Sequence, residues 1–405
     1  MLLKRDFLVG LKAHLKTQLL FGTTPIIFRE NKSLHDHEEG FLCHSSNNTI
    51  PKQWFKLLFS TIFVTVWWFQ IVQSIKEENL VTILESMLYA VALSTFILMK
   101  RAYLQKRRFV VELLNMVLRF EFTHFETNSS EINQNQGYKY FIFFCQLSGI
   151  LGTPILILAY SLQRWFNPCT SATFAYRLFL PECSAINPLQ ISWKFSSLLA
   201  LFLTILLSIW VIIDLCGCLM FQTFELAFVQ CCCLKEYLKW LHGVMKSSAL
   251  GQFDLSLVSV YRELQLLSRL YNWIQQDVII IALTNMTVFV FIVSLYALIL
   301  MGSHASVPHI LFFSSVVLLG LLVIVVCFGT FAGLHTQSTK LIVFLRKKVN
   351  LSVWKPHKKR LIERYSWSLR EIKVSIGQVN FVDKLTPVIM LNFCISQIVS
   401  LLLIE

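Results

Sequence analysis

Residues 261–300 read YRELQLLSRLYNWIQQDVIIIALTNMTVFVFIVSLYALIL, and two helix patterns follow one another within this stretch. After Asp277 it contains no charged residue, and it is long enough to cross a hydrocarbon core of about 30 Å as a helix. Before Asp277 the apolar residues alternate steps of three and four, the spacing of a helix that packs on other helices. The stretch therefore predicts an amphipathic helix outside the membrane that leads directly into a membrane span.

The rest of the chain has the same apolar character. Of its 405 residues, 55% are hydrophobic and only 15% are charged, whereas a soluble chain carries about 25% charged residues. Seven stretches are long and apolar enough to be spans: 55–74, 80–99, 140–162, 195–219, 278–301, 309–334 and 385–404. We therefore expect an all-α membrane protein with seven transmembrane helices.

Basic residues alternate between the loops. Segments 1–54, 100–139, 220–277 and 335–384 hold seven, seven, five and twelve Lys and Arg, while loops 75–79, 163–194 and 302–307 hold one, three and none. Because the basic side of a membrane protein is normally cytoplasmic, the N-terminus is expected inside and the C-terminus outside. The net charge of +13 thus reflects topology and does not indicate nucleic-acid binding.

The inner segments themselves have helical patterns. We expect four regions: 1–54, a cytoplasmic segment with an amphipathic helix; 55–334, spans one to six with helical inner loops; 335–384, a cytoplasmic loop and helix; and 385–404, the last span. The apolar stripes of 253–274 and 355–376 predict a helical bundle beneath the membrane. Such a bundle either packs within one chain or holds subunits together, and the pattern alone favours neither. Because the stripes lie outside the membrane and need a partner surface, we predict that they hold subunits together.

Polar residues form a stripe on the last span. Asn392, Ser396 and Ser400 lie four residues apart and cover an arc of about 80° on a helix, with Gln397 at one edge. Because polar groups are costly against lipid, this face is expected to contact protein or water. Close helix packing and the lining of a water-filled path both fit the spacing.

A second group of candidates lies near the outer ends of the spans. Glu85 is a carboxylate at membrane depth, which favours a functional role. Aromatic rings with a few polar groups suit a small-molecule pocket, although the aromatic belt at the membrane interface is the commoner explanation for any single ring. The aromatic candidates are Tyr89, Tyr160, Trp193 and Tyr296. For Asp214, near an inner end, interfacial solvation or an Arg partner is the expected explanation.

Other chemistry has little support in the sequence. Cys169 and Cys183 share an outer loop, where an oxidising compartment favours a disulfide. We find no catalytic constellation, no phosphate-binding loop and no metal-ligand spacing, so neither an enzyme nor a cofactor is expected.

The architecture and two stretches resemble the insect gustatory receptor family, which belongs with the odorant receptors. The first is 261–300, which looks like the family's cytoplasmic helix feeding span five. The second is SWSLREIKVSIGQVNFVDKLTPVIMLNFCISQIVSLLLIE at 366–405, in which Gly377, Phe381 and Asp383 look like the family's segment before the last helix. In the last span, Ser396-Gln397 and Leu403-Ile404 stand where the family commonly has Thr-Tyr and Gln-Phe.

The resemblance implies a gustatory chemoreceptor in the plasma membrane of sensory neurons. It implies a subunit of a ligand-gated, non-selective cation channel that detects tastants and mediates acceptance or avoidance. Four identical or related subunits would surround a central pore lined by Asn392, Ser396, Gln397 and Ser400. Leu401 and Ile404 would form a hydrophobic gate that closes by dewetting. Each subunit would hold a small-molecule tastant in its outer half.

Two other classes remain as alternatives. A G-protein-coupled receptor places its N-terminus outside, and the sequence lacks Asp-Arg-Tyr after span three and Asn-Pro-x-x-Tyr in span seven. A transporter predicts inverted repeats with broken helices at matching positions, and none is evident.

The charge distribution predicts the location of both chain ends. Of 36 Lys and Arg, 31 fall on the predicted inner side and four on the outer side. An epitope tag at the N-terminus should stain only after cells are permeabilised, whereas a C-terminal tag should stain on intact cells. Staining of the N-terminal tag on intact cells would overturn the topology.

Overall fold

The computed structural model describes most of the chain outside residues 126–194. The described residues are 12–13, 15–16, 26–30, 41–45, 50–75, 80–125, 147, 195–223, 227, 230–247, 255–301, 307–351, 356–378 and 380–404. The predicted span 140–162 therefore lies almost entirely outside them, as do Tyr160, Trp193, Cys169 and Cys183.

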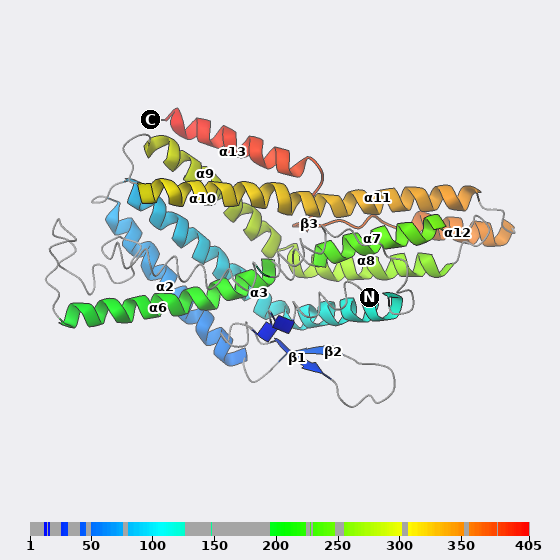
Figure 1. The fold of residues 1–405 in the computed structure, drawn as a ribbon, viewed down its shortest axis with the longest axis horizontal. Coiled ribbons are helices and arrows are strands. Elements are labelled where there is room, and N and C mark those ends of the chain that lie inside the picture. Colours follow the sequence, from blue (N-terminus) through cyan, green and yellow to red (C-terminus); the bar gives the residue numbers. More distant parts are fainter. Residues whose placement is uncertain are drawn as a thin grey trace.

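The described helices form an elongated body with two halves (Figure 1). One half gathers α2 (Ile50–Ser74), the start of α3 (Leu80–Phe125), α6 (Phe195–Met220), α9 (Ile279–Met301), α10 (Val307–Leu322) and α13 (Thr386–Leu402). The other half holds the end of α3, α7 (Gln230–Ser247), α8 (Leu255–Gln275), α11 (Phe328–Leu351) and α12 (Pro356–Ser368). A π-helical turn, η6 (Val323–Cys327), joins α10 to α11 without a break. Two long helices, α3 and α10–η6–α11, thus run through both halves.

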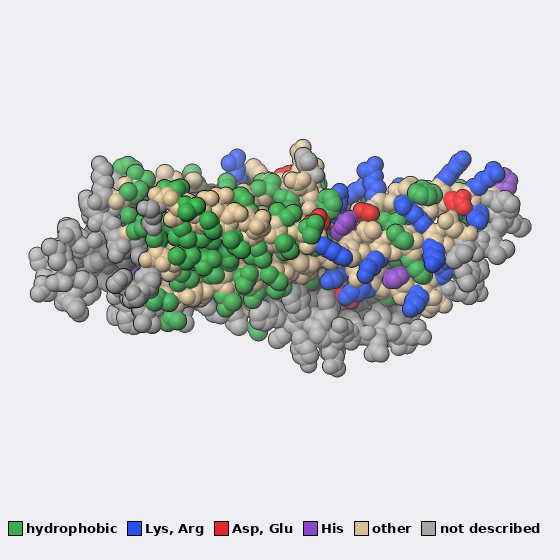
Figure 2. Space-filling view, turned by 90° about the horizontal axis from the view of Figure 1, so that it is seen from above, with side chains coloured by type: hydrophobic (Ala, Val, Ile, Leu, Met, Phe, Trp, Pro, Cys, Tyr) green, Lys and Arg blue, Asp and Glu red, His purple; other side chains and the backbone are tan. Residues whose placement is uncertain are grey.

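The surface divides in the same way. Figure 2 shows apolar side chains over one half of the visible face and Lys and Arg over the other. Four described helical segments are long and apolar enough to cross a membrane, namely Ile83–Glu121, Leu206–Thr223, Ile279–Leu300 and His309–Asn350, and Thr386–Leu402 is a shorter apolar helix. A predominantly helical structure, with several helices long and apolar enough to cross a membrane, is therefore confirmed among the described residues, while the count of seven and the topology stay predictions.

Two short hairpins depart from the all-α expectation. Strands β1 (Ile26–Glu30) and β2 (Phe41–Ser45) pair antiparallel within the N-terminal segment, where only an amphipathic helix was expected. Strands β3 (Ser375–Ile376) and β4 (Asn380–Phe381) pair just before α13. Each hairpin is short and lies beside the helical body, so the described part of the protein remains predominantly helical.

The stripe on α8 is buried within its own chain. Leu264, Leu267 and Tyr271 are at most 2% exposed, and they share a core cluster with residues of α3, α7 and α11. The expectation that this stripe holds subunits together is therefore wrong, because an amphipathic pattern shows only that a face is buried.

Helix α8 is also not continuous with the span that follows, since residues 276–278 form a turn and α9 leaves at an angle (Figure 1).

The second inner helix is shorter than predicted. Helix α12 ends at Ser368, and residues 369–374 have no regular secondary structure, so a helix over 355–376 is wrong. Leu361 and Tyr365 on α12 are about half exposed, whereas Leu369 and Ile372, after its end, are buried. The predicted stripe is thus split between an exposed helix and a buried extended segment.

A buried ion pair connects three helices inside the apolar half. The Asp214 carboxylate on α6 is paired with the Lys100 ammonium on α3, which is fully buried, and lies 3.8 Å from the Lys56 ammonium on α2. Asp214 is 1% exposed, so interfacial solvation is not its explanation, and its partners are Lys rather than Arg. A buried charge of this kind requires its partner to remain in place.

This pair predicts an asymmetric mutational response. Asp214→Leu leaves the Lys100 ammonium buried without its carboxylate and should cost about 3–5 kcal/mol of stability, whereas Lys100→Met with Asp214→Leu should recover most of the loss. The loss in the single variant and the recovery in the double variant are both measured as shifts in the melting temperature of the detergent-purified protein, monitored by size-exclusion chromatography after heating. If Asp214→Leu melts like the wild type, the pair does not hold these helices together.

Candidate functional site

Helix α13 contacts its own chain along one stripe. Met390, Cys394 and Ile398 are its buried residues, spaced four apart, and Cys394 and Ile398 form a cluster with Phe291 of α9. The remaining sides are open, and five large apolar side chains on them are at least 50% exposed: Val388, Ile389, Phe393, Ile395 and Val399. An apolar helix docked on one narrow face has most of its surface available to another molecule.

The predicted polar stripe lies opposite that docked face. At 100° per residue, Asn392, Ser396 and Ser400 are centred about 200° from Cys394, and all three are exposed, as is Gln397. The two serine hydroxyls donate to carbonyl oxygens one turn back, Ser396 to Asn392 and Ser400 to Ser396, each at 2.9 Å. Their hydrogens are thus used within the helix, and their oxygen lone pairs point outward as acceptors.

The two predicted gate residues have different positions. Leu401 lies about 20° from Cys394 around the helix, which places it beside the docked stripe, and it is 37% exposed. Ile404 follows the last residue of α13 and is 82% exposed. Ile404 is therefore the more accessible of the two at this end of the helix.

Asp383 fixes the start of α13. Its carboxylate accepts the backbone N–H groups of Leu385 and Thr386 and the Thr386 hydroxyl at 2.8–3.0 Å, while its own N–H donates to the Thr386 Oγ. The hydrogen bond from the Thr386 hydroxyl, with the two backbone bonds, lowers the pKa of Asp383. Because the folded-state pKa is lowered, this contribution is present above the ordinary carboxyl pKa and is lost as pH falls through the lowered value.

Residues 369–382, here called the strap, connect this start to the other half of the molecule. The Asn272 amide of α8 donates to the Lys373 carbonyl at 2.7 Å and accepts the Ser375 N–H at 2.9 Å.

The strap is also bonded to α11, where the Ser338 hydroxyl accepts the Ile372 N–H at 2.7 Å. Tyr261 of α8 lies 2.8 Å from the Ser338 Oγ and donates to the Arg370 carbonyl at 3.0 Å. The strap is thus held between α8 and α11.

Gly377 turns the strap back toward α13. Its φ of +60° is in the left-handed region that favours glycine, and its N–H donates to the Gln276 carbonyl at 3.0 Å, in the turn between α8 and α9. The residue therefore closes the hairpin between β3 and β4. Phe381, at the far side of this hairpin, packs against His335, with ring centroids 5.0 Å apart.

Three of the five predicted ligand residues are described. Glu85 of α3 is 2% exposed and lies 3.7 Å from the His309 Nε2 of α10. One turn later, Tyr89 stacks between Trp67 of α2 and Phe312 of α10, with ring centroids 6.3 and 5.9 Å away. The structure thus brings Glu85 and Tyr89 together in one aromatic and acidic cluster.

The third described residue, Tyr296, is half-buried on α9, beside Ala297, which packs with Leu88 and Phe313. His309, Trp67 and Phe312 were missed by the sequence reasoning. The apolar pattern marks them only as span residues, because their partners are distant in the chain.

The Asp383 cap predicts a local change in α13. Asp383→Ala removes the acceptor and should weaken the first turn by about 1 kcal/mol, so the amides of Leu385 and Thr386 should exchange hydrogen about fivefold faster. Asp383→Asn retains a side-chain oxygen and should stay near the wild-type rate. Equal exchange in the alanine and asparagine variants would show that the cap does not set the start of the helix.

Comparison with known proteins gives a match at the level of the fold. No protein-family model matches the chain, and no curated protein does. The solved insect olfactory receptor OR5 from Machilis hrabei aligns with a TM-score of 0.61 and 12% identity, over 100% of both chains. The same receptor in complex with eugenol aligns with the same TM-score and identity, over 99% of this chain and 98% of that one. Over its whole length, the chain has the fold of an insect olfactory receptor.

Proposed function

We propose that this protein is an insect chemoreceptor of the gustatory type, and that it forms a subunit of a ligand-gated, non-selective cation channel. In this proposal it crosses the plasma membrane of a sensory neuron seven times, with the N-terminus inside and the C-terminus outside. The full-length fold likeness to an insect olfactory receptor supports a chemoreceptor. The basic half of the molecule supports the inner location of α7, α8, α11 and α12 (Figure 2).

The observation that carries the proposal is the position of the polar stripe on α13, on the side opposite the docked face. In a tetramer of identical or related subunits, neighbouring copies would cover the exposed apolar flanks that include Phe393 and Ile395. The stripe of Asn392, Ser396 and Ser400 would then face the central axis. Close packing alone would explain small residues there, but four helices meeting at an axis would also leave a path between them.

The hydroxyl orientation supports a cation path. Because the Ser396 and Ser400 hydrogens are bonded within the helix, each residue offers oxygen lone pairs to the axis. Rings of such oxygens suit hydrated cations better than anions. Because positions 396 and 400 carry no charge, the path is expected to select only weakly among cations. In the proposed channel, Ile404 narrows the outer mouth, whereas Leu401 lies beside the docked stripe, away from the axis.

The cluster around Glu85 is the proposed ligand region. A buried carboxylate beside Tyr89, Trp67 and Phe312 combines a polar group with aromatic surfaces, as small-molecule sites commonly do. The related fold has been solved with eugenol, a small aromatic molecule, which supports a small-molecule tastant for this chain. Tyr296, Tyr160 and Trp193 remain proposed contributors, and a Cys169–Cys183 disulfide remains proposed for the outer loop.

The strap provides a connection from this region to α13. Helices α3 and α9 contribute to the outer clusters, and the α8–α9 turn binds Gly377 next to the base of α13. A ligand that changes the packing of α9 would therefore act on both the docked stripe and the strap.

Cysteine accessibility along α13 tests the proposal. If the polar face lines a water-filled path, Ser396→Cys and Ser400→Cys should react quickly with a small charged thiol reagent applied from outside, because water supports the thiolate. Modification should also change the agonist-evoked current. Ile395→Cys, on the covered flank, should react slowly or not at all, and the buried native Cys394 serves as the internal control.

Opening should speed modification at position 396 more than at position 404, since the gate lies between position 396 and the outside. Reactivity without helical periodicity, or a current indifferent to modification at positions 392, 396 and 400, would assign the stripe to packing.

A further inference from the structure

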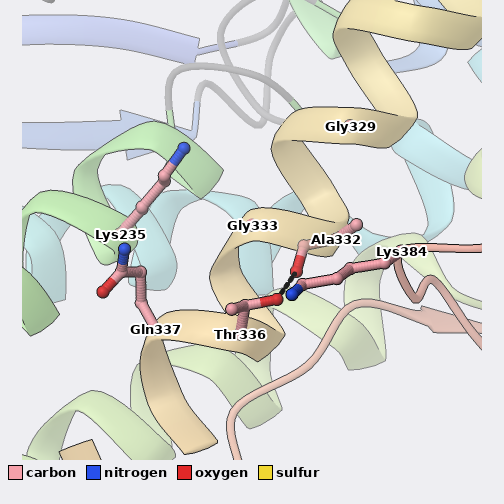
Figure 3. Close-up of a pocket in the computed structure, with 7 residues that line it drawn as sticks. All are labelled: Lys235, Gly329, Ala332, Gly333, Thr336, Gln337 and Lys384. Atoms are coloured by element: carbon pink, nitrogen blue, oxygen red, sulfur yellow. Dashed lines mark hydrogen bonds between the residues drawn. The ribbon is translucent and has the colours of Figure 1, made fainter. Parts of the chain in front are cut away.

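A hollow of about 280 Å³ lies between α7, α11 and Lys384, which comes two residues before the start of α13. Figure 3 shows Lys235 of α7 and Lys384 approaching it from opposite sides, with α11 between them. The side of α11 that faces the hollow consists of small and polar residues: Gly329, Ala332, Gly333, Thr336 and Gln337. Two ammonium groups from segments far apart in the sequence therefore share one cavity.

Neither lysine is neutralised within the part of the chain that the structure describes. Among those residues, no carboxylate lies within ion-pair distance of the Lys235 or Lys384 ammonium. Lys340, one turn beyond Thr336 on α11, adds further positive charge outside the cavity. Two ammonium groups are among the residues that line the hollow, so it is electropositive and favours an anion.

Gly333 gives Lys235 its place in the cavity. A Cβ added at Gly333 would lie 3.0 Å from the Lys235 Nζ and 3.3 Å from its Cε, so the lysine lies directly along the glycine surface of α11. Gly329 has no heavy atom within 4 Å of an added Cβ, which leaves open space beside it. The absence of side chains at these two positions keeps both the lysine and the space accessible.

The polar groups in the cavity suit a phosphate-bearing ligand. Lysine ammonium groups bind phosphate as point charges. The Gln337 amide, which also lines the cavity, adds N–H donors. The Thr336 hydroxyl donates to the Ala332 carbonyl at 3.2 Å, as the dashed line in Figure 3 shows, so its hydrogen is used within α11.

The apolar surface next to the cavity indicates where such a ligand comes from. Leu322 and Val325, on the continuous helix one to two turns before Gly329, are 48% and 51% exposed. Beyond the cavity the helix becomes basic, with Lys340, Arg346 and Lys347. The cavity thus lies at the boundary between apolar and basic surface, the level at which headgroups of the cytoplasmic leaflet lie.

We propose that Lys235, Lys384 and Gln337 form a binding site for a phosphate-bearing anion, and that its source is the headgroup of an anionic membrane lipid whose acyl chains lie along Leu322 and Val325. The lipid source rests on the proposed topology, in which this boundary faces the cytoplasm. The bound headgroup would join α7 to the residue that follows the Asp383 cap. It would therefore act on the same end of α13 that the strap holds.

The site is tested by native mass spectrometry on the purified full-length protein in detergent. The probes are a short-chain phosphatidylinositol bisphosphate, its soluble headgroup inositol trisphosphate, and inorganic phosphate. Lys235→Gln with Lys384→Gln should weaken lipid binding by at least about tenfold. Gly333→Leu retains both charges but fills the cavity, and it should weaken binding to a similar degree. Lys340→Gln, on the same helix outside the cavity, is the charge-matched control and should bind like the wild type.

Lipid binding that exceeds binding of both soluble probes supports the lipid headgroup as the source. Equal binding of inositol trisphosphate supports the anion site and overturns the lipid source. The site itself is wrong if Lys340→Gln loses as much affinity as the double variant, or if Gly333→Leu binds like the wild type. Because the readout is binding to purified protein, a failure here is distinct from a failure of channel function, which current recordings report.

Discussion

The single docked stripe on α13 is the constraint on which the proposed function depends. Met390, Cys394 and Ile398 attach the helix to α9 and its neighbours, and the opposite face carries Asn392, Ser396 and Ser400. A helix attached this way has two exposed apolar flanks and an exposed polar stripe, and the described residues of its own chain cover neither. In the proposed assembly, copies of the chain around an axis would cover the flanks and leave the polar stripe facing water, which would satisfy both kinds of surface.

The base of the same helix is held much more firmly. The strap is bonded to α8 through Asn272 and to α11 through Ser338, and Asp383 then fixes the first turn. Motion of α13 is therefore expected to pivot about this base, with the outer end moving more. The proposed anion site lies directly beside the pivot, at Lys384, which makes it a position where a bound headgroup can alter the pivot without contacting the axis.

Much of the fold can be predicted from the sequence because hydrocarbon imposes simple rules. The apolar lengths identify α6, α9 and α10, and the alternating steps of three and four identify α8 with nearly the observed bounds. The polar stripe on α13 is likewise visible, since Asn392, Ser396 and Ser400 recur every four residues. These signals are local, so one sequence contains them.

Features that depend on distant partners could not be predicted. The pattern on α8 shows that Leu264 is buried, but not that α3, α7 and α11 of the same chain bury it. Asp214 is visible as a carboxylate at membrane depth, yet Lys100 is found only when α3 and α6 are packed. The end of α12 at Ser368 was missed because Leu369 and Ile372 continue the helical spacing. In the structure the Ile372 N–H donates to the Ser338 hydroxyl, and the Val374 carbonyl accepts the Val382 N–H, in place of helical hydrogen bonds.

The arrangement of α13 around a shared axis is tested most directly by oxidative cross-linking of Ser400→Cys in membranes. Covalent dimers are expected on a non-reducing gel, because position 400 on one copy would lie close to position 400 on another. Leu58→Cys, which is also exposed in one chain but lies on α2, should give none above the wild-type background. If Ser400→Cys cross-links no more than Leu58→Cys, the last helices do not meet at an axis and α13 does not line the pore.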